Sequence, residues 1–294
     1  MISRRRFLTI AAAAVLARPA RAAETVEWHG RAMGSAARIV LTGTHRVAAR
    51  RLFREVERLL AQVEARFSLH TDSGLVRLNR DGRWDWPDPQ VLELFRLAGK
   101  VHAATGGAFD PTVQPLWRAI ATGGDAAAAH ELIGWQDVEI ADAAIRLARP
   151  GMALTFNGIA QGHAADLVAA ILRQHGFADV LIDMGEISAL GCRPDGHAWR
   201  AAIAGPDGRT LETAELSDRA LAVSSPEGTV IGPGAAHSHI LDPSGSGPRW
   251  WISAVTAPSA ALADALSTGF CVMDRTAIDA ALTAFPEARL AVLD

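Results

Sequence analysis

Asp264 and Thr268 stand four residues apart in a nearly apolar segment, Ser259 to Met273, that reads SAALADALSTGFCVM. A four-residue step places both side chains on one side of a helix, one turn apart. A buried carboxylate needs a hydrogen-bonding partner, a countercharge or a metal ion. Two interpretations are open. Either Asp264 caps a helix or pairs with an arginine while Thr268 bonds back to its own turn, or the two oxygens hold a cation.

Two glycine-containing segments carry a second kind of chemistry. In TFNGIAQGHAAD, Gly158 and Gly162 flank the start of an expected helix, where backbone N–H groups can hold an anion such as phosphate. The segment lacks the Gly-Lys-Ser/Thr of a P-loop and the spacing of a dinucleotide fingerprint. In TGGAFDPTVQPL, residues 105–116, two glycines free the backbone before a turn formed by an apolar residue, Asp, Pro and Thr.

His239 lies in HSHILDPSG, residues 237–245, which predicts a strand followed by a tight turn. A single histidine on a strand is more often structural than catalytic. The residue type nevertheless suits a general base, because the ordinary pKa of histidine lies near neutral pH.

The elements that must position these residues mix strands and helices without strict βαβ alternation. This pattern predicts an α+β fold, with mixed or antiparallel sheets packed against helices. We expect a first strand over 26–43 that is broken at Met33-Gly34. The expected helices cover 45–68, 89–107, the residues after Gly158, and the Asp264 segment. The expected strands include 137–141, 144–148, 153–156, 179–191, 199–206, 219–225, 238–243 and 251–257.

The N-terminus reads as a secretory signal. SRRRFL is a twin-arginine pattern, LTIAAAAVLA is a hydrophobic core too short to span a bilayer, and Ala20 to Ala22 form a small-x-small cleavage site. We therefore predict a twin-arginine signal peptide at 1–22 and one domain over 23–294. The expected protein is exported to a bacterial periplasm and carries no lipid or membrane anchor.

The composition of the chain argues against one class of binding partner. The chain has 294 residues and a net charge of −3, and the first 22 residues contribute five arginines and no acid, so the remainder carries −8. Such an acidic body lacks the basic stripe that binds phosphate backbones, which argues against a nucleic-acid partner. Cys192 and Cys271 both lie in apolar surroundings, so we expect free thiols.

Taken in order, the motifs resemble the ApbE family of FAD:protein FMN transferases. The resemblance covers about residues 30–275 and rests on Met-Gly near the first strand, FSLHTDSGLVRLN, TGGAFDPTVQPL, NGIAQGHAAD, DMGEISALG, SHILDPSG and ADALSTG. The signal peptide and DMGEISALG further resemble the NosX-type branch. Members of that branch serve the flavoprotein of the nitrous-oxide reduction system.

The resemblance implies a reaction and a set of residues. Family members use Mg²⁺ and FAD, transfer the FMN half onto a Ser or Thr hydroxyl of a target flavoprotein, and release AMP. By position, His239 is the implied general base. The carbonyl of Gly158 and the side chains of Asp264 and Thr268 are the implied metal ligands, all of them oxygens as Mg²⁺ prefers. The implied FAD contacts are Met33, His70, Ala108, Phe109, Asp110, Thr155 and Gln161.

Four positions depart from the pattern of many members. His70 replaces a tyrosine, Thr155 and Gln161 replace an Asp and a Lys, and Glu186 stands near a usual Asp. These changes reduce stacking area and alter charge around FAD, which leaves two further functions open. One is a FAD pyrophosphatase that gives FMN and AMP with water as acceptor. The other is a non-catalytic periplasmic flavin-binding or assembly protein, which His70 and Gln161 favour.

Overall fold

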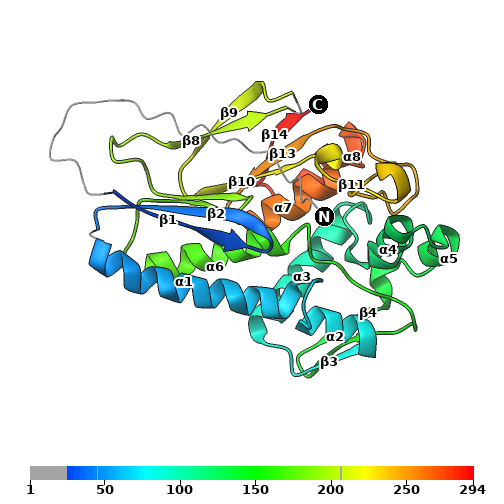
Figure 1. Cartoon of the computed structure of the whole chain (residues 1–294). Coiled ribbons are helices and arrows are strands. Elements are labelled where there is room, and N and C mark those ends of the chain that lie inside the picture. Colours follow the sequence, from blue (N-terminus) through cyan, green and yellow to red (C-terminus); the bar gives the residue numbers. More distant parts are fainter. Residues whose placement is uncertain (1–24, 45, 206) are drawn as a thin grey trace.

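A seven-stranded sheet runs through the molecule in the spatial order β1-β2-β6-β7-β10-β13-β14, and every neighbouring pair is antiparallel (Figure 1). The computed structural model describes residues 25–44, 46–205 and 207–294, so the predicted signal peptide lies outside the described residues. The strands of this sheet are β1 (Thr25–Ala32), β2 (Ser35–Thr42), β6 (Val180–Asp183), β7 (Ile187–Leu190), β10 (Arg219–Ser224), β13 (Ser253–Ala257) and β14 (Arg289–Leu293).

Three smaller sheets and a set of helices surround it. The small sheets are β3 (Arg83–Asp85), β5 (Ala144–Leu147) and β4 (Val138–Ala141); β8 (Trp199–Ala204) and β9 (Thr210–Leu216); and β11 (Val230–Ile231) and β12 (His237–Ser238). The helices are α1 (Arg46–Phe67), α2 (Gly74–Asp81), α3 (Pro89–Ala104), α4 (Gln114–Thr122), α5 (Ala126–His130), α6 (Ala160–Gln174), α7 (Ala260–Phe270) and α8 (Arg275–Thr283). The 3₁₀ turns are η1 (Pro111–Val113), η2 (Trp135–Asp137), η3 (Pro226–Gly228) and η4 (Pro233–Ala235). The predicted α+β fold with antiparallel sheets and helices is confirmed.

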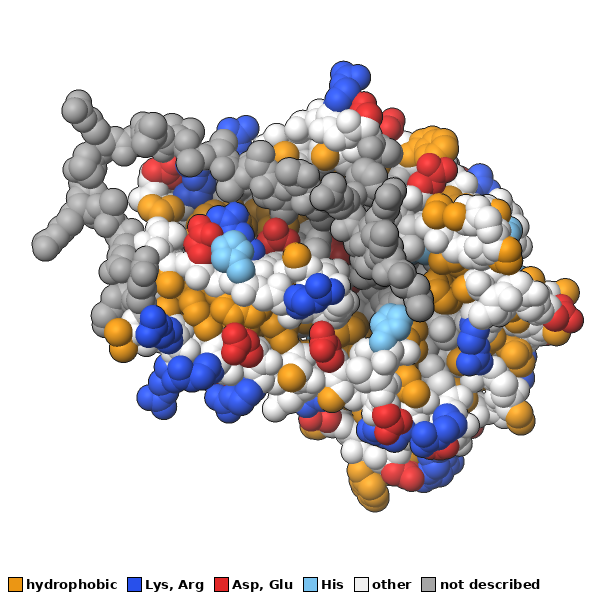
Figure 2. Space-filling model, viewed as in Figure 1, with side chains coloured by type: hydrophobic (Ala, Val, Ile, Leu, Met, Phe, Trp, Pro, Cys, Tyr) orange, Lys and Arg blue, Asp and Glu red, His pale blue; other side chains and the backbone are white. Residues whose placement is uncertain are grey.

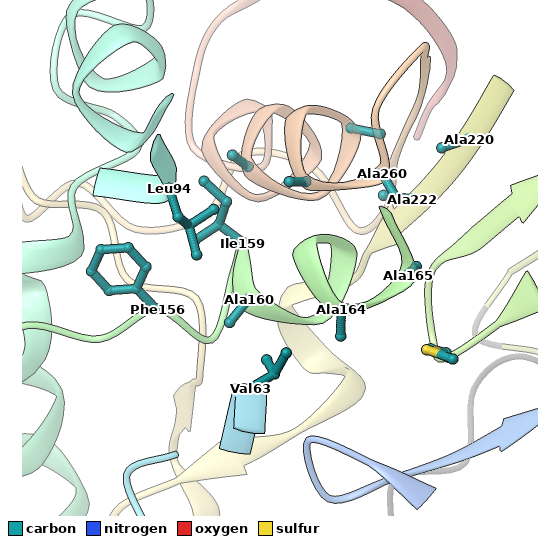
Figure 3. Packing of buried hydrophobic residues seen from close by; sticks show 14 of the residues in the cluster. Val63, Leu94, Phe156, Ile159, Ala160, Ala164, Ala165, Ala220, Ala222 and Ala260 are labelled. Carbon is teal, nitrogen blue, oxygen red and sulfur yellow. The ribbon is translucent and has the colours of Figure 1, made fainter. Parts of the chain in front are cut away.

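The main core lies between one face of the large sheet and helices α1, α6 and α7. Figure 3 shows Ala260 of α7 near Ala222 of β10, and Val63 of α1 beneath Ala160 and Ala164 of α6. Small residues let α6 and α7 approach closely. A Cβ on Gly162 would overlap the backbone carbonyl of Ala260, so only glycine permits this spacing. The approach matters for the site because α6 and α7 both contribute to it.

The opposite face of the sheet carries a second, smaller core under the β8–β9 hairpin. Trp199, Ile203 and Leu216 of the hairpin pack there against Ile187 and Leu221 of the sheet. The sheet is therefore covered on both faces. Charged side chains make up much of the solvent-facing surface of α1, and Figure 2 shows basic and acidic side chains interspersed along it.

Most elements follow the sequence pattern, with local exceptions. The predicted break at Met33-Gly34 is a two-residue hairpin turn in which both residues have positive φ, 48° and 81°. The predicted strand at 153–156 is wrong, because this segment bonds to the Asn79 side chain and to the 3₁₀ turn η1 instead of a neighbouring strand. The predicted strand at 238–243 is wrong beyond Ser238, because β12 ends there and the chain turns at Asp242, whose side chain accepts from the N–H of Ser244.

Among the described residues, no helix is both long and apolar enough to cross a bilayer.

Candidate functional site

The polar face of α7 points at the glycine bend that precedes α6. Asp264 is only 4% exposed, and its Oδ2 accepts a hydrogen bond from the backbone N–H of Gly162 at 3.1 Å. One turn further on, Thr268 lies against Gly158: a Cβ built on that glycine would stand 2.8 Å from Thr268 Oγ1. The structure therefore brings together the three residues implied as metal ligands, and their role as ligands stays a prediction.

Asp166 of α6 fixes where α7 begins. Its carboxylate accepts hydrogen bonds from the Ser259 hydroxyl at 2.7 Å and from the backbone N–H groups of Ala260 at 2.7 Å and Ala261 at 2.9 Å. A carboxylate at a helix N-terminus satisfies donors that have no partner within the helix. Our sequence analysis missed this residue. The sequence feature that could have identified it is an acidic residue one turn after Gly162 on the same apolar helix.

Asp264 is a buried acid whose environment favours proton or cation binding. Burial raises its pKa to about 7, and the nearby negative charge of Asp166 acts in the same direction, while the hydrogen bond from Gly162 opposes it. Among the described residues no ion pair engages Asp264. A buried carboxylate without a countercharge is costly. The donor set around it consists of carboxylate, hydroxyl and backbone oxygens.

This donor set fits a hard divalent cation better than a soft one. No group of three or more His, Cys, Asp or Glu side chains able to hold a metal occurs among the described residues. Magnesium does not require such a group, because it is commonly held by one or two carboxylates, with water and substrate phosphate completing its octahedron. The Asp264 carboxylate, the Thr268 hydroxyl and the Gly158 carbonyl are oxygens of the required kind.

His239 directly follows β12, and its ring contacts the segment that comes after β10. Its Nδ1 lies 3.0 Å from the carbonyl oxygen of Pro226 and 2.9 Å from that of Thr229. Carbonyl oxygens can only accept, so Nδ1 carries the proton, and Nε2 is the basic nitrogen of the neutral ring. Ser224, two residues before Pro226, approaches Thr268 Oγ1 at 3.4 Å. His239 and the polar face of α7 therefore both contact the chain near the end of β10.

The loop after α3 packs directly on α7. A Cβ on Gly269 would stand 3.1 Å from Phe109 Cβ, which places Phe109 beside the residue that follows Thr268. Two hydrogen bonds fix the Phe109 backbone: its N–H donates to Thr105 Oγ1 at 3.1 Å, and its carbonyl lies 3.1 Å from His102 Nδ1. The half-buried Ala108 precedes it in the same turn.

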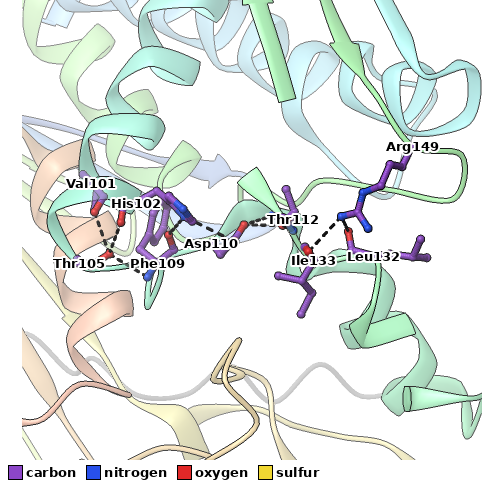
Figure 4. Close-up of polar contacts among 10 residues, drawn as sticks. Val101, His102, Thr105, Phe109, Asp110, Thr112, Leu132, Ile133 and Arg149 are labelled. Atoms are coloured by element: carbon purple, nitrogen blue, oxygen red, sulfur yellow. Dashed lines mark hydrogen bonds and ion pairs between the residues drawn. The ribbon is translucent and has the colours of Figure 1, made fainter. Parts of the chain in front are cut away.

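Asp110 turns its carboxylate into this loop (Figure 4). Its Oδ1 accepts from the backbone N–H of Thr112 at 2.8 Å and from the Thr112 hydroxyl at 2.6 Å, and its Oδ2 lies 3.6 Å from His102 Nδ1. Burial raises the pKa of Asp110, and the bonds from Thr112 oppose that shift. The implied contact between Asp110 and FAD stays a prediction, but the side chain already caps η1.

The segment carrying Thr155 and Gly158 is held from two sides. The Asn79 side chain bonds to both backbone groups of Leu154, at 2.7 and 2.9 Å. The N–H of Thr155 donates to the carbonyl of Pro111 at 2.8 Å, and its hydroxyl accepts from Asn157 at 3.2 Å. These bonds replace a strand ladder. They place Thr155 beside the Phe109 loop and the glycine bend near α7.

The remaining three residues implied to contact FAD lie in three other parts of the fold. Gln161 donates from Nε2 to the carbonyl of Met184 in the β6–β7 turn. Met33 is half-buried at the β1–β2 turn, and His70 is exposed in the loop after α1. No hydrogen bond among the described residues links any of these three side chains to α7. Their contact with FAD stays a prediction.

Comparisons with known proteins identify the fold. The chain is 29% identical over 289 residues to a FAD:protein FMN transferase of Vibrio cholerae, covering 90% of this chain and 86% of the relative. It is 27% identical to that of Salmonella typhimurium, covering 86% and 79%. It superposes on the flavin transferase ApbE from Vibrio cholerae with a TM-score of 0.80 at 28% identity, covering 91% and 93%. For the apo form of the Pseudomonas stutzeri flavinyl transferase ApbE, the TM-score is 0.79 at 28% identity, covering 92% of each chain.

The fold is thus that of the solved flavin transferases. A family model described as the ApbE family matches residues 33–292, and the chain belongs to the ApbE family. The family resemblance inferred from the motifs is confirmed.

Proposed function

We propose that this chain transfers the FMN half of FAD to a Ser or Thr hydroxyl of an acceptor flavoprotein and releases AMP. The observation that carries the proposal is the buried Asp264 carboxylate, which faces the glycine bend together with Thr268 and has no ion-pair partner among the described residues. The relatives named FAD:protein FMN transferase, which match most of the chain, support it.

In this reaction the acceptor oxygen forms a bond to the phosphorus of the FMN phosphate, and the pyrophosphate P–O bond to AMP breaks. His239 takes the hydroxyl proton at Nε2, because its Nδ1 proton is committed to the carbonyl oxygens of Pro226 and Thr229. Those two hydrogen bonds fix the ring orientation before substrate binds. AMP leaves with the electron pair of the broken bond, so atoms and charge balance.

Asp264, Thr268 and the Gly158 carbonyl would hold Mg²⁺ in this proposal. When bound, the ion would neutralise charge on the diphosphate, which is the main requirement for phosphoryl transfer. The protein prepares this position by clamping α7 to α6. Asp166 fixes the first turn of α7, and Gly162 both permits the close approach and donates to Asp264.

FAD would lie along the Phe109 loop and the Thr155 segment. The Asp110 carboxylate is engaged by Thr112, so we assign it to ordering the loop, with the backbone of Ala108 and Phe109 facing the flavin nucleotide. Met33, His70 and Gln161 would contact parts of FAD further from the diphosphate. The imidazole of His70 offers a smaller stacking surface than a tyrosine ring.

A single assay tests this function. The mature protein is incubated with FAD, Mg²⁺ and an acceptor domain that carries a flavinylation-type Ser or Thr, and the products are separated. We expect a fluorescent covalent flavin band and an equal amount of AMP. Free FMN and AMP without the band would establish a FAD pyrophosphatase instead. Tight FAD binding with neither product would establish a binding or assembly protein.

We also propose that the chain works in the periplasm after twin-arginine export and that its acceptor belongs to a nitrous-oxide reduction system. The Arg4 to Arg6 motif and the DMGEISALG segment support these two points. Replacing Arg4 and Arg5 by lysine should leave the protein in the cytoplasmic fraction. Its appearance in the periplasm regardless would contradict the export route.

A further inference from the structure

Three hydroxyl groups form a row where β10 meets α7. The Ser224 Oγ lies 2.8 Å from the Ser267 Oγ and 3.4 Å from the Thr268 Oγ1. The Ser267 Oγ in turn lies 3.0 Å from the backbone carbonyl oxygen of Asp264. The row therefore ends on a group that can only accept a hydrogen bond.

That end group sets the direction of every proton in the row. Each hydroxyl has a single hydrogen, and Ser267 donates its hydrogen to the Asp264 carbonyl. Ser224 must then be the donor to Ser267. With the Ser224 hydrogen used in this way, Thr268 must donate to Ser224.

We propose that Ser224 is a positioning residue that orients the Thr268 hydroxyl. With its hydrogen directed to Ser224, Thr268 Oγ1 keeps its lone pairs for the side on which Gly158 lies. A Cβ built on Gly158 would stand 2.8 Å from the same oxygen, so the Gly158 bend lies beside it. The inference deepens the proposed function, on whose metal site it rests.

The position of Ser224 is itself well defined. It is the last residue of β10 and pairs with Ser253 of β13 in the antiparallel ladder. Ser253 provides a matched control, because its buried hydroxyl has no hydrogen-bond partner within the described part of the chain. The two serines thus share a strand environment and differ in whether the hydroxyl reaches Thr268.

Binding of Mn²⁺ to the purified mature protein tests the proposal without any turnover. Free Mn²⁺ is measured by electron paramagnetic resonance during a titration. Ser224→Ala should raise the Mn²⁺ dissociation constant about tenfold, the effect typical of removing a partner that orients a metal ligand. Ser224→Thr should restore the affinity, because a β-branched residue with a hydroxyl fits a strand. Ser253→Ala should bind Mn²⁺ like the unsubstituted protein.

A double-substitution cycle separates orientation of Thr268 from a general loss of structure. In a Thr268→Val background, Ser224→Ala should cause no further loss of affinity. An equal loss in both backgrounds, or unchanged affinity in Ser224→Ala, would overturn the role of Ser224. If Ser224→Ala does not fold, Ser267→Ala serves in its place, since it removes the acceptor that directs the Ser224 proton and should also weaken binding.

The same titration distinguishes failure of the two proposals. Absence of Mn²⁺ binding by the unsubstituted protein, both alone and with FAD, would remove the metal site and the Ser224 inference together. Normal binding that is insensitive to Ser224 would remove only the inference.

Discussion

Acidification should destabilise this protein through His163, a histidine outside the proposed reaction. The residue lies on α6 and is 8% exposed, with its ring edge-on to Phe67 at a centroid distance of 6.0 Å. Its Nε2 is buried without a hydrogen-bond partner among the described residues. Burial lowers the pKa of His163 from 6.5 to about 4, and the positive charge of Arg66 acts in the same direction.

The sign of the effect follows from proton uptake. Below pH 6.5 the unfolded chain binds a proton at this residue, whereas the folded protein binds none until the pH approaches 4. The destabilising effect of His163 is therefore absent above pH 6.5, and the free energy of unfolding decreases as the pH falls towards 4. The difference between the two pKa values corresponds to about 3 kcal/mol of unfolding free energy.

Urea unfolding at several pH values between 7.5 and 4 measures this loss, with His163→Phe as the matched variant. Phenylalanine keeps an aromatic ring beside Phe67 and removes the titrating nitrogens. Asp110, Asp166 and Asp264 have raised pKa values and contribute with the opposite sign, but both proteins contain them, so they cancel. The free-energy difference between the proteins should shift by about 3 kcal/mol in favour of the variant. Parallel pH profiles would refute the assignment to His163.

Three further substitutions test the parts of the site separately. His239→Gln should leave FAD affinity within about twofold and lower the rate of covalent flavin formation by about 10² to 10⁴, as for loss of a general base; equal loss of binding and transfer would make His239 structural. Gly162→Ala should lower the unfolding free energy by about 1–3 kcal/mol, because the new methyl group meets the Ala260 carbonyl. Gly228→Ala is its control, since no heavy atom lies closer than 3.7 Å to that Cβ position. Asp166→Ala should cost on the order of 3 kcal/mol in urea unfolding, because Ser259 and two backbone N–H groups at the start of α7 lose their acceptor. If Asp166→Ala lost less unfolding free energy than Asp166→Asn, which keeps one acceptor oxygen, that role would be contradicted.

The sequence was sufficient to predict the features that depend on local spacing. The sequence predicted a helix over 45–68, where α1 lies, and Met33-Gly34 predicted the turn between β1 and β2. The four-residue step between Asp264 and Thr268 predicted their shared helix face. Each of these depends on one short segment, so no knowledge of distant contacts was needed.

The features that the sequence could not predict depend on long-range contacts. The segment at 153–156 has strand-like residues, but Asn79 and Pro111 supply its hydrogen bonds, and neither is recognisable as a partner from spacing. Asp166 and Ser224 were missed for the same reason. Their roles arise only when α6 and β10 are packed against α7.

The central claim is that α7 and the glycine bend hold a divalent cation against the diphosphate of FAD. Crystals of the mature protein soaked with FAD and Mn²⁺ test it most directly, through the anomalous scattering of manganese. We predict a peak bounded by the Asp264 carboxylate, the Thr268 hydroxyl and the Gly158 carbonyl. A fully bound FAD with manganese elsewhere, or with no manganese peak at all, would contradict the account.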